Sequence, residues 1–264
     1  MALTRNQKIA IGALTVGFAY VGYRRYAHSY QYGPLTGSIH GGVQLHRPGP
    51  LADGESAMSF DGQSGWIEIA QPVFNGSAWS WEGWMAPTAY QGSPLAWSTQ
   101  PGLTTAAQNA TYLANFPPYG FLFGANTNYS LSGGLVTAPV KLNQWAYWVV
   151  TYTAQSGLIL TINGKPTQGP PTHANATGQL YPTIGAGNLT GWYDNVGNFF
   201  QGSLAHIATY DYALSASQIR AHWVASQNKA WGTYSRLVLA DKPQGYWPLN
   251  ETSGTVAHDV ISLH

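Results

Sequence analysis

The sequence contains no cysteine, so neither a disulfide framework nor a thiolate metal site can form. Charge is also scarce: Asp, Glu, Lys and Arg make up 8% of the 264 residues, and the formal net charge of +1 gives no electrostatic argument for a nucleic-acid partner. Aromatic residues, at 14%, supply the apolar area that a packed core needs, which argues against disorder. A surface built mainly from uncharged polar residues suits exported, virion or cell-surface proteins.

Local motifs of several enzyme classes are missing as well. The sequence has no Gly-x-Ser-x-Gly elbow of the kind that presents a nucleophilic serine. It also has no phosphate-binding loop and no dinucleotide fingerprint. The sequence therefore offers no local signature of nucleophilic-serine, phosphate-loop or dinucleotide chemistry.

Residues 1–28 differ from the rest of the chain, because they hold an uncharged run, residues 9–23, between Arg5 and Lys8 on one side and Arg24 and Arg25 on the other. As a helix this run would be about 22 Å long, which is shorter than the hydrocarbon core of a bilayer, roughly 30 Å. We expect an apolar helix here, and three roles stay open: a membrane anchor, a helix docked in a protein assembly, or an uncleaved signal peptide.

The stretch 199–223 gives the clearest local pattern. Residues 203–212 alternate, which predicts a strand with Leu204, His206, Ala208 and Tyr210 on one face. Ser215 stands three residues before Gln218, which is the spacing of a capping box, and predicts a short helix near 215–226. We expect His206 to be a structural residue of the strand.

This stretch resembles the C-terminal signature of LamG-like domains, the laminin-G/concanavalin A-like jelly rolls. The matching residues are Phe200, Gly202, Leu204, Ile207, Tyr210, Asp211, Ala213, Leu214, Ser215, Gln218 and Ile219. Further matches lie in residues 48–69, 79–85, 145–153 and 158–164. The resemblance implies an all-β chain folded as a concanavalin A-like jelly-roll sandwich, and a fold of this kind does not by itself name an activity.

The C-terminal segment resembles the beginning, not the end, of a LamG-like domain. Residues 234–259 match the run that opens such domains in phage and bacterial proteins. The order is therefore permuted, and we expect an apolar anchor helix over 1–28, the jelly roll over 29–225, and a linker and completing segment over 226–264. Residues 245–251 would supply the missing strand either to their own domain or to a neighbouring copy, since a sandwich lacking one strand exposes unpaired backbone groups.

The loop before the last strand holds the candidate binding residues. Trp192, Tyr193, Asp194 and Asn195 combine aromatic faces with polar side chains, as glycan binding requires, although the two aromatic rings would equally pack over the end of the sandwich. Trp97 and Tyr119 are weaker candidates. The resemblance also implies calcium as a possible ion, and Asp194, Asn195 and Asn198 would be its oxygen ligands.

The resemblance leads to a functional expectation. The laminarinase-type hydrolases of this fold carry a Glu-x-Asp-x-x-Glu strand motif, which this sequence lacks, so we expect a protein that is not an enzyme. We expect a viral (phage) virion structural protein that carries a LamG-like jelly roll on the particle and binds glycans, with other virion proteins or copies of itself as partners and no nucleic acid. The alternative is a membrane-anchored, lectin-like adhesin on the surface of a bacterium.

Overall fold

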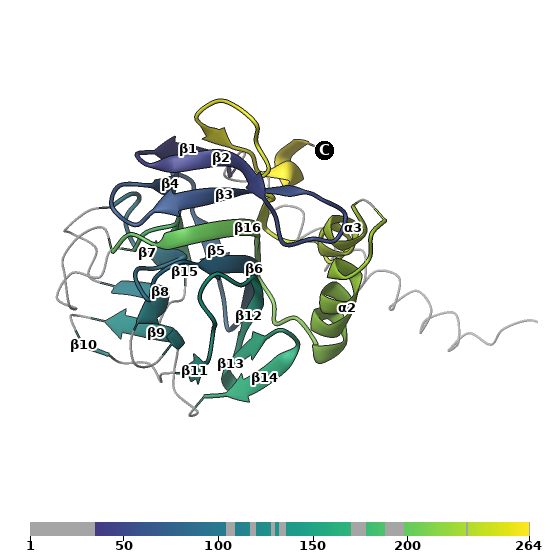
Figure 1. The fold of residues 1–264 in the computed structure, drawn as a ribbon. Coiled ribbons are helices and arrows are strands. Elements are labelled where there is room, and N and C mark those ends of the chain that lie inside the picture. Colours follow the sequence, from purple (N-terminus) through teal and green to yellow (C-terminus); the bar gives the residue numbers. More distant parts are fainter. Residues whose placement is uncertain are drawn as a thin grey trace, which may run out of the picture.

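The structure, a computed structural model, describes residues 35–103, 109–116, 120–127, 130–131, 136–169, 178–187, 198–230 and 232–263. These residues form a sandwich of two antiparallel sheets with a pair of helices beside one of them (Figure 1). The apolar helix expected in residues 1–28 lies outside the described residues. Within the described ranges, no helix has the length and apolar character needed to cross a membrane.

In the described part of the chain, the first sheet has ten strands in the order β10-β9-β8-β7-β15-β4-β1-β18, with β11 paired to β9 and β5 paired to β15. Its strands are β1 (Gly37–His40), β4 (Trp66–Ile69), β5 (Val73–Asn75), β7 (Leu95–Ser98), β8 (Asn109–Phe116), β9 (Gly120–Thr127), β10 (Ser130–Leu131), β11 (Val136–Ala138), β15 (Gly178–Ile184) and β18 (Val256–Ala257).

The second sheet, counted over the same described ranges, has eight strands in the order β14-β13-β12-β6-β16-β3-β2, with β17 paired to β16. Its strands are β2 (Val43–Pro48), β3 (Ser56–Asp61), β6 (Ala78–Pro87), β12 (Ala146–Thr153), β13 (Gly157–Ile162), β14 (Lys165–Gln168), β16 (Gln201–Tyr210) and β17 (Gly245–Trp247). The all-β jelly-roll prediction is thereby confirmed.

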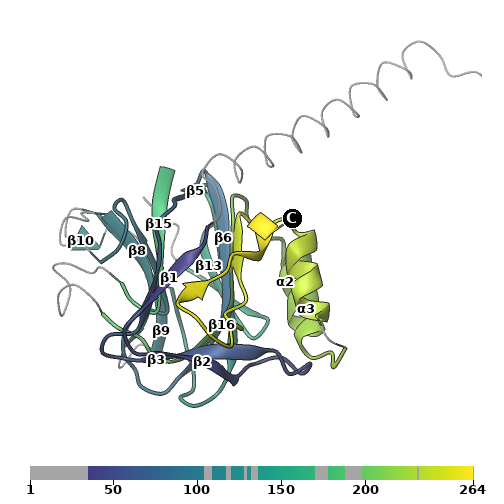
Figure 2. The same cartoon turned by 90° about the horizontal axis from the view of Figure 1, so that it is seen from above.

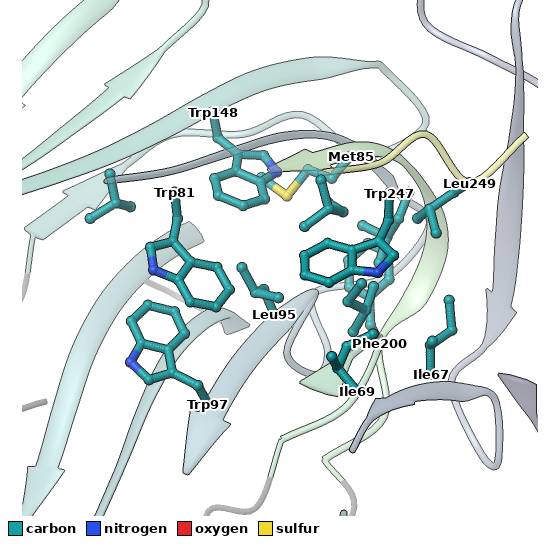
Figure 3. Close-up of a cluster of buried hydrophobic side chains, with 14 of the residues drawn as sticks. Ile67, Ile69, Trp81, Met85, Leu95, Trp97, Trp148, Phe200, Trp247 and Leu249 are labelled. Atoms are coloured by element: carbon teal, nitrogen blue, oxygen red, sulfur yellow. The ribbon is translucent and has the colours of Figure 1, made fainter. Parts of the chain in front are cut away.

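The core between the two sheets is rich in tryptophan. Trp81 and Trp97 stack with ring centroids 3.9 Å apart and an interplanar angle of 8°. Figure 3 shows these two rings with Trp148 and Trp247 among aliphatic side chains. Trp97, a weaker candidate for glycan binding, is only 1% exposed, so that prediction is wrong.

Helices α2 (Ala216–Ser226) and α3 (Thr233–Ala240) lie against the outer face of the second sheet (Figure 2). Ser215 caps α2 in a capping box with Gln218, as the spacing predicted. The helices explain why β12 is apolar on both faces. Trp148 and Val150 point into the sandwich, whereas Tyr147 and Val149 pack under the helices.

The predicted alternation along β16 holds only on each side of a β-bulge. The register with β6 shifts between Ala205 and Ala208, and His206 inside the bulge has a φ of 54°. Leu204 therefore faces the sandwich core, while Ala208 and Tyr210 face the helices. The prediction that these residues share one face is wrong, because the bulge inserts an extra residue that inverts the alternation.

The C-terminal segment adds a strand to each sheet of its own chain. Trp247 of β17 pairs with Ile207 of β16, and Ala257 of β18 pairs with Gly37 of β1. The indole of Trp247 also donates a hydrogen bond of 2.6 Å to the carbonyl of Leu35. A short 3-10 helix, η1 (Val260–Leu263), follows. One segment thus contributes to both sheets, with β18 next to β1 at the end of the first sheet and β17 next to β16 in the second.

Candidate functional site

A buried ionisable cluster, which we call the helix clamp, lies between the second sheet and the helix pair. It consists of Glu82 on β6, Tyr147 on β12, Tyr210 on β16, and His222 and Asp241 from the helical part of the chain. Glu82 is 0% exposed and accepts hydrogen bonds from the hydroxyls of Tyr147 and Tyr210. His222 Nδ1 lies 3.0 Å from Glu82 Oε2, and its Nε2 lies 3.1 Å from Asp241 Oδ2.

The charges of the clamp support one another. Burial raises the pKa of Glu82, but the charge of His222 and the donated hydrogen bonds outweigh this, so that the pKa lies below its ordinary value. Burial likewise lowers the pKa of His222, but Glu82 and Asp241 outweigh it and hold that pKa above the ordinary value. Burial raises the pKa of Tyr147 well above the usual range. A carboxylate and an imidazolium therefore coexist as an ion pair, with neutral phenols around them.

A second buried polar group surrounds the bulge of β16. His206 Nδ1 lies 2.7 Å from the hydroxyl of Tyr246 on β17, and that hydroxyl donates a 3.0 Å hydrogen bond to Ser235 on α3. His206 Nε2 lies 3.6 Å from Glu55 Oε2. Burial lowers the pKa of His206 to about 4, so the imidazole is neutral at physiological pH. The prediction of a structural role for His206 agrees with these contacts.

The clamp holds chemically capable groups, but a substrate cannot reach them. Catalysis by paired carboxylates requires that both flank a bond of the substrate. Glu82 has no exposed surface, and its oxygens are occupied by Tyr147, Tyr210 and His222. Shifted pKa values often mark functional sites, although structural ion pairs shift them as well. The geometry of the clamp is that of a structural ion pair, which attaches α2 to the second sheet.

The outer face of the first sheet carries a partly exposed cluster of three side chains. His40 on β1 is directly opposite Trp66 on β4, and their rings stack with centroids 4.4 Å apart and an interplanar angle of 18°. Glu68 follows on the same face, and its Oε2 lies 3.4 Å from His40 Nε2. Sequence reasoning missed this cluster, although the alternation of Trp66 and Glu68 with the buried Ile67 and Ile69 marks them as outward-facing.

The glycan-binding residues predicted from the sequence, Trp192, Tyr193, Asp194 and Asn195, lie outside the described residues, as does Tyr119. Asn198 is described. Its side-chain amide donates a 3.1 Å hydrogen bond to Ser93 Oγ, and its carbonyl accepts one of 3.0 Å from the Ser93 amide. Among the described residues, no group of three or more His, Asp or Glu side chains is arranged to hold a metal ion. Of the three predicted calcium ligands, Asn198 is the one that the structure describes.

Comparison with known proteins places this geometry in a family. Residues 61–220 match the family model described as the concanavalin A-like lectin/glucanases superfamily. Among curated proteins, no sequence matches the chain.

Several solved structures are similar to this chain. The full-length tailspike protein 2 of Escherichia coli O157:H7 bacteriophage CAB120 superposes with a TM-score of 0.55 and 10% identity, over 83% of this chain and 30% of that chain. The heptameric SAP-like pentraxin of Limulus polyphemus superposes with a TM-score of 0.47 and 14% identity, over 74% of this chain and 84% of that chain. Botulinum neurotoxin type C, which interacts with two ganglioside molecules, superposes with a TM-score of 0.49 and 13% identity, over 75% of this chain and 48% of that chain. At 10% identity the likeness to the tailspike protein concerns the fold alone.

Proposed function

This chain belongs to the concanavalin A-like lectin/glucanases superfamily, and on that premise we propose that it is a structural protein of a phage-type virus particle. Its jelly roll is displayed on the particle, where it binds glycans without cleaving them. Residues 1–28 tether the domain to the particle. The partners of the tether are other virion proteins, copies of this chain, or a membrane that residues 9–23 enter.

The observation that carries the proposal is the closure of the sandwich by its own C-terminal segment. Residues 234–259 resemble the opening of LamG-like domains in phage and bacterial proteins, and in this chain they supply β17 and β18 to the two sheets. A domain closed in this way needs no neighbour to complete it, so a tether at one end is enough for display. A bacteriophage tailspike with this fold supports the same reading.

Glycan recognition is the second part of the proposal. We assign it to the loop that holds Trp192, Tyr193, Asp194 and Asn195, with calcium bound by Asp194, Asn195 and Asn198. The geometry of Asn198 supports this, because its amide nitrogen donates to Ser93 and its side-chain oxygen is the atom left to act as a hard ligand. Non-catalytic binding is favoured by the inaccessibility of Glu82.

The second candidate function is a membrane-anchored, lectin-like adhesin on a bacterial surface. The apolar run of residues 9–23, with basic residues on both sides, favours it. Quantitative mass spectrometry of purified particles and of host envelopes separates the two. A virion protein is expected at a fixed copy number relative to the major capsid protein. Enrichment in envelopes from uninfected cells, with loss from purified particles, would replace the first function by the second.

A further inference from the structure

The outer face of the first sheet carries a group of described side chains that suits the binding of a sugar. His40 and Trp66 form a stacked pair of rings, and the side chain of His40 is 40% exposed. The Glu68 side chain is 29% exposed and lies beside this pair. Ser38, opposite Glu68 on β1, is exposed. Stacked rings, a carboxylate and a hydroxyl therefore share one solvent-facing patch.

This patch makes no contribution to the sandwich core. Ile67 and Ile69, which alternate with Trp66 and Glu68, are fully buried and supply the packing of β4. A tryptophan on the outward face of a strand keeps apolar area in contact with water, which costs about 25 cal/mol for each Å². A bound molecule with an apolar face would remove that area from water.

Gly102 is buried and brings the backbone of its loop close to the carboxylate of Glu68. Its φ is +71°, and a Cβ at this position would lie 2.9 Å from Glu68 Oε1 and 3.9 Å from the Trp66 ring. A side chain here would be strained and would crowd the carboxylate. The backbone of the loop thus borders the patch at Oε1 of Glu68 and at the edge of the Trp66 indole.

We propose that His40, Trp66, Glu68 and Ser38 form a binding subsite for a neutral saccharide. The inference rests on the proposed glycan-binding function, and it assigns that function a second site on the first sheet. The C–H face of a pyranose ring packs on the aromatic pair. Adjacent hydroxyls of the sugar donate to the two oxygens of Glu68, of which Oε2 lies 3.4 Å from His40 Nε2.

The charge of the subsite selects among sugars. Glu68 is an acceptor for hydroxyl donors, whereas a carboxylate on the ligand would meet a like charge at short range. The site therefore favours neutral hexoses over sialic or uronic acids.

Isothermal titration calorimetry of the full chain tests the inference. The probes are linear tetrasaccharides of glucose, mannose and galactose, with sialyllactose as the acidic counterpart. The wild type should bind at least one neutral probe, and Trp66→Ala should weaken that binding about tenfold, the equivalent of about 1.4 kcal/mol. Glu68→Gln, which keeps the shape of the side chain, should weaken it about threefold or more, because the charged acceptor is lost. Val224→Ala, at an exposed position on α2, is the matched surface control and should bind as the wild type does.

The outcomes separate this inference from the proposed function. If the neutral probes bind Trp66→Ala and Glu68→Gln as tightly as the wild type, the subsite is wrong and glycan binding stands. Loss of binding in Trp192→Ala alone leads to the same conclusion. Tighter binding of sialyllactose than of every neutral probe overturns the assigned sugar class. If no glycan binds the wild type, both proposals fail. Should Trp66→Ala not fold, the half-exposed Glu68→Gln variant decides.

Discussion

Replacing His222 with alanine should destabilise the protein far more than any surface change on the same helix. The substitution leaves the carboxylate of Glu82 buried without its counterion, and Asp241 loses the same partner. Removing one member of a buried ion pair costs about 3–5 kcal/mol, because the remaining charge stays desolvated. For a chain of this size that corresponds to a fall in melting temperature of roughly 6–20 °C.

Calorimetry and urea unfolding at neutral pH measure this effect. Arg220→Ala provides the control, since Arg220 is exposed on the same helix, and surface substitutions of this kind change stability by about 0.5 kcal/mol or less. In the double variant Glu82→Gln/His222→Ala the total cost should be smaller than the sum of the single costs, because the fully buried position 82 no longer carries a charge without a counterion. If His222→Ala and Arg220→Ala unfolded at the same temperature and urea concentration, the idea that the clamp is a buried ion pair would be refuted.

Two further predictions concern the bulge and the C-terminal segment. Asparagine tolerates a φ of 54°, the value at His206, so His206→Asn should keep the bulge. The substitution should also remove a pH dependence of the free energy of unfolding. The imidazole of His206 takes up a proton near pH 6.5 in the unfolded chain and only near pH 4 in the folded chain. Acidification between these two pH values should therefore lower the unfolding free energy of the wild type relative to the variant, by up to about 3 kcal/mol. Urea titrations at a series of pH values measure this difference. Trp247→Ala should cost about 3–5 kcal/mol and speed proteolysis of the C-terminal segment, whereas the exposed Thr255→Ala should do neither.

The sequence predicted those features whose signals are local. The strand expected over 203–212 is β16, and the helix expected near 215–226 is α2, because alternation and a capping box are patterns of neighbouring residues. Helix α3 was not predicted. It has only eight residues, and its stability comes from the burial of Tyr234 and Val238 against the sheet, which no local pattern reveals.

The helix clamp was beyond the reach of sequence patterns for a related reason. Glu82 and His222 are separated by 140 positions in the chain, and only the docking of α2 on the second sheet brings them together. The bulge at His206 illustrates the opposite case. The local alternation around it is real, but one inserted residue places Leu204 and Ala208 on opposite faces of the sheet. The Trp66 cluster was predictable in part, since alternation gives its face, whereas the stacking of His40 on Trp66 depends on the register between β1 and β4.

The central claim is that this jelly roll binds glycans and does not cleave them. The most direct test is to incubate the full chain with a panel of immobilised and soluble polysaccharides and to measure, in the same samples, retained protein and newly formed reducing ends. We expect at least one polysaccharide to retain the protein, with no reducing ends above the protein-free control. Retention by none of them, or release of reducing ends that scales with protein concentration, would contradict it.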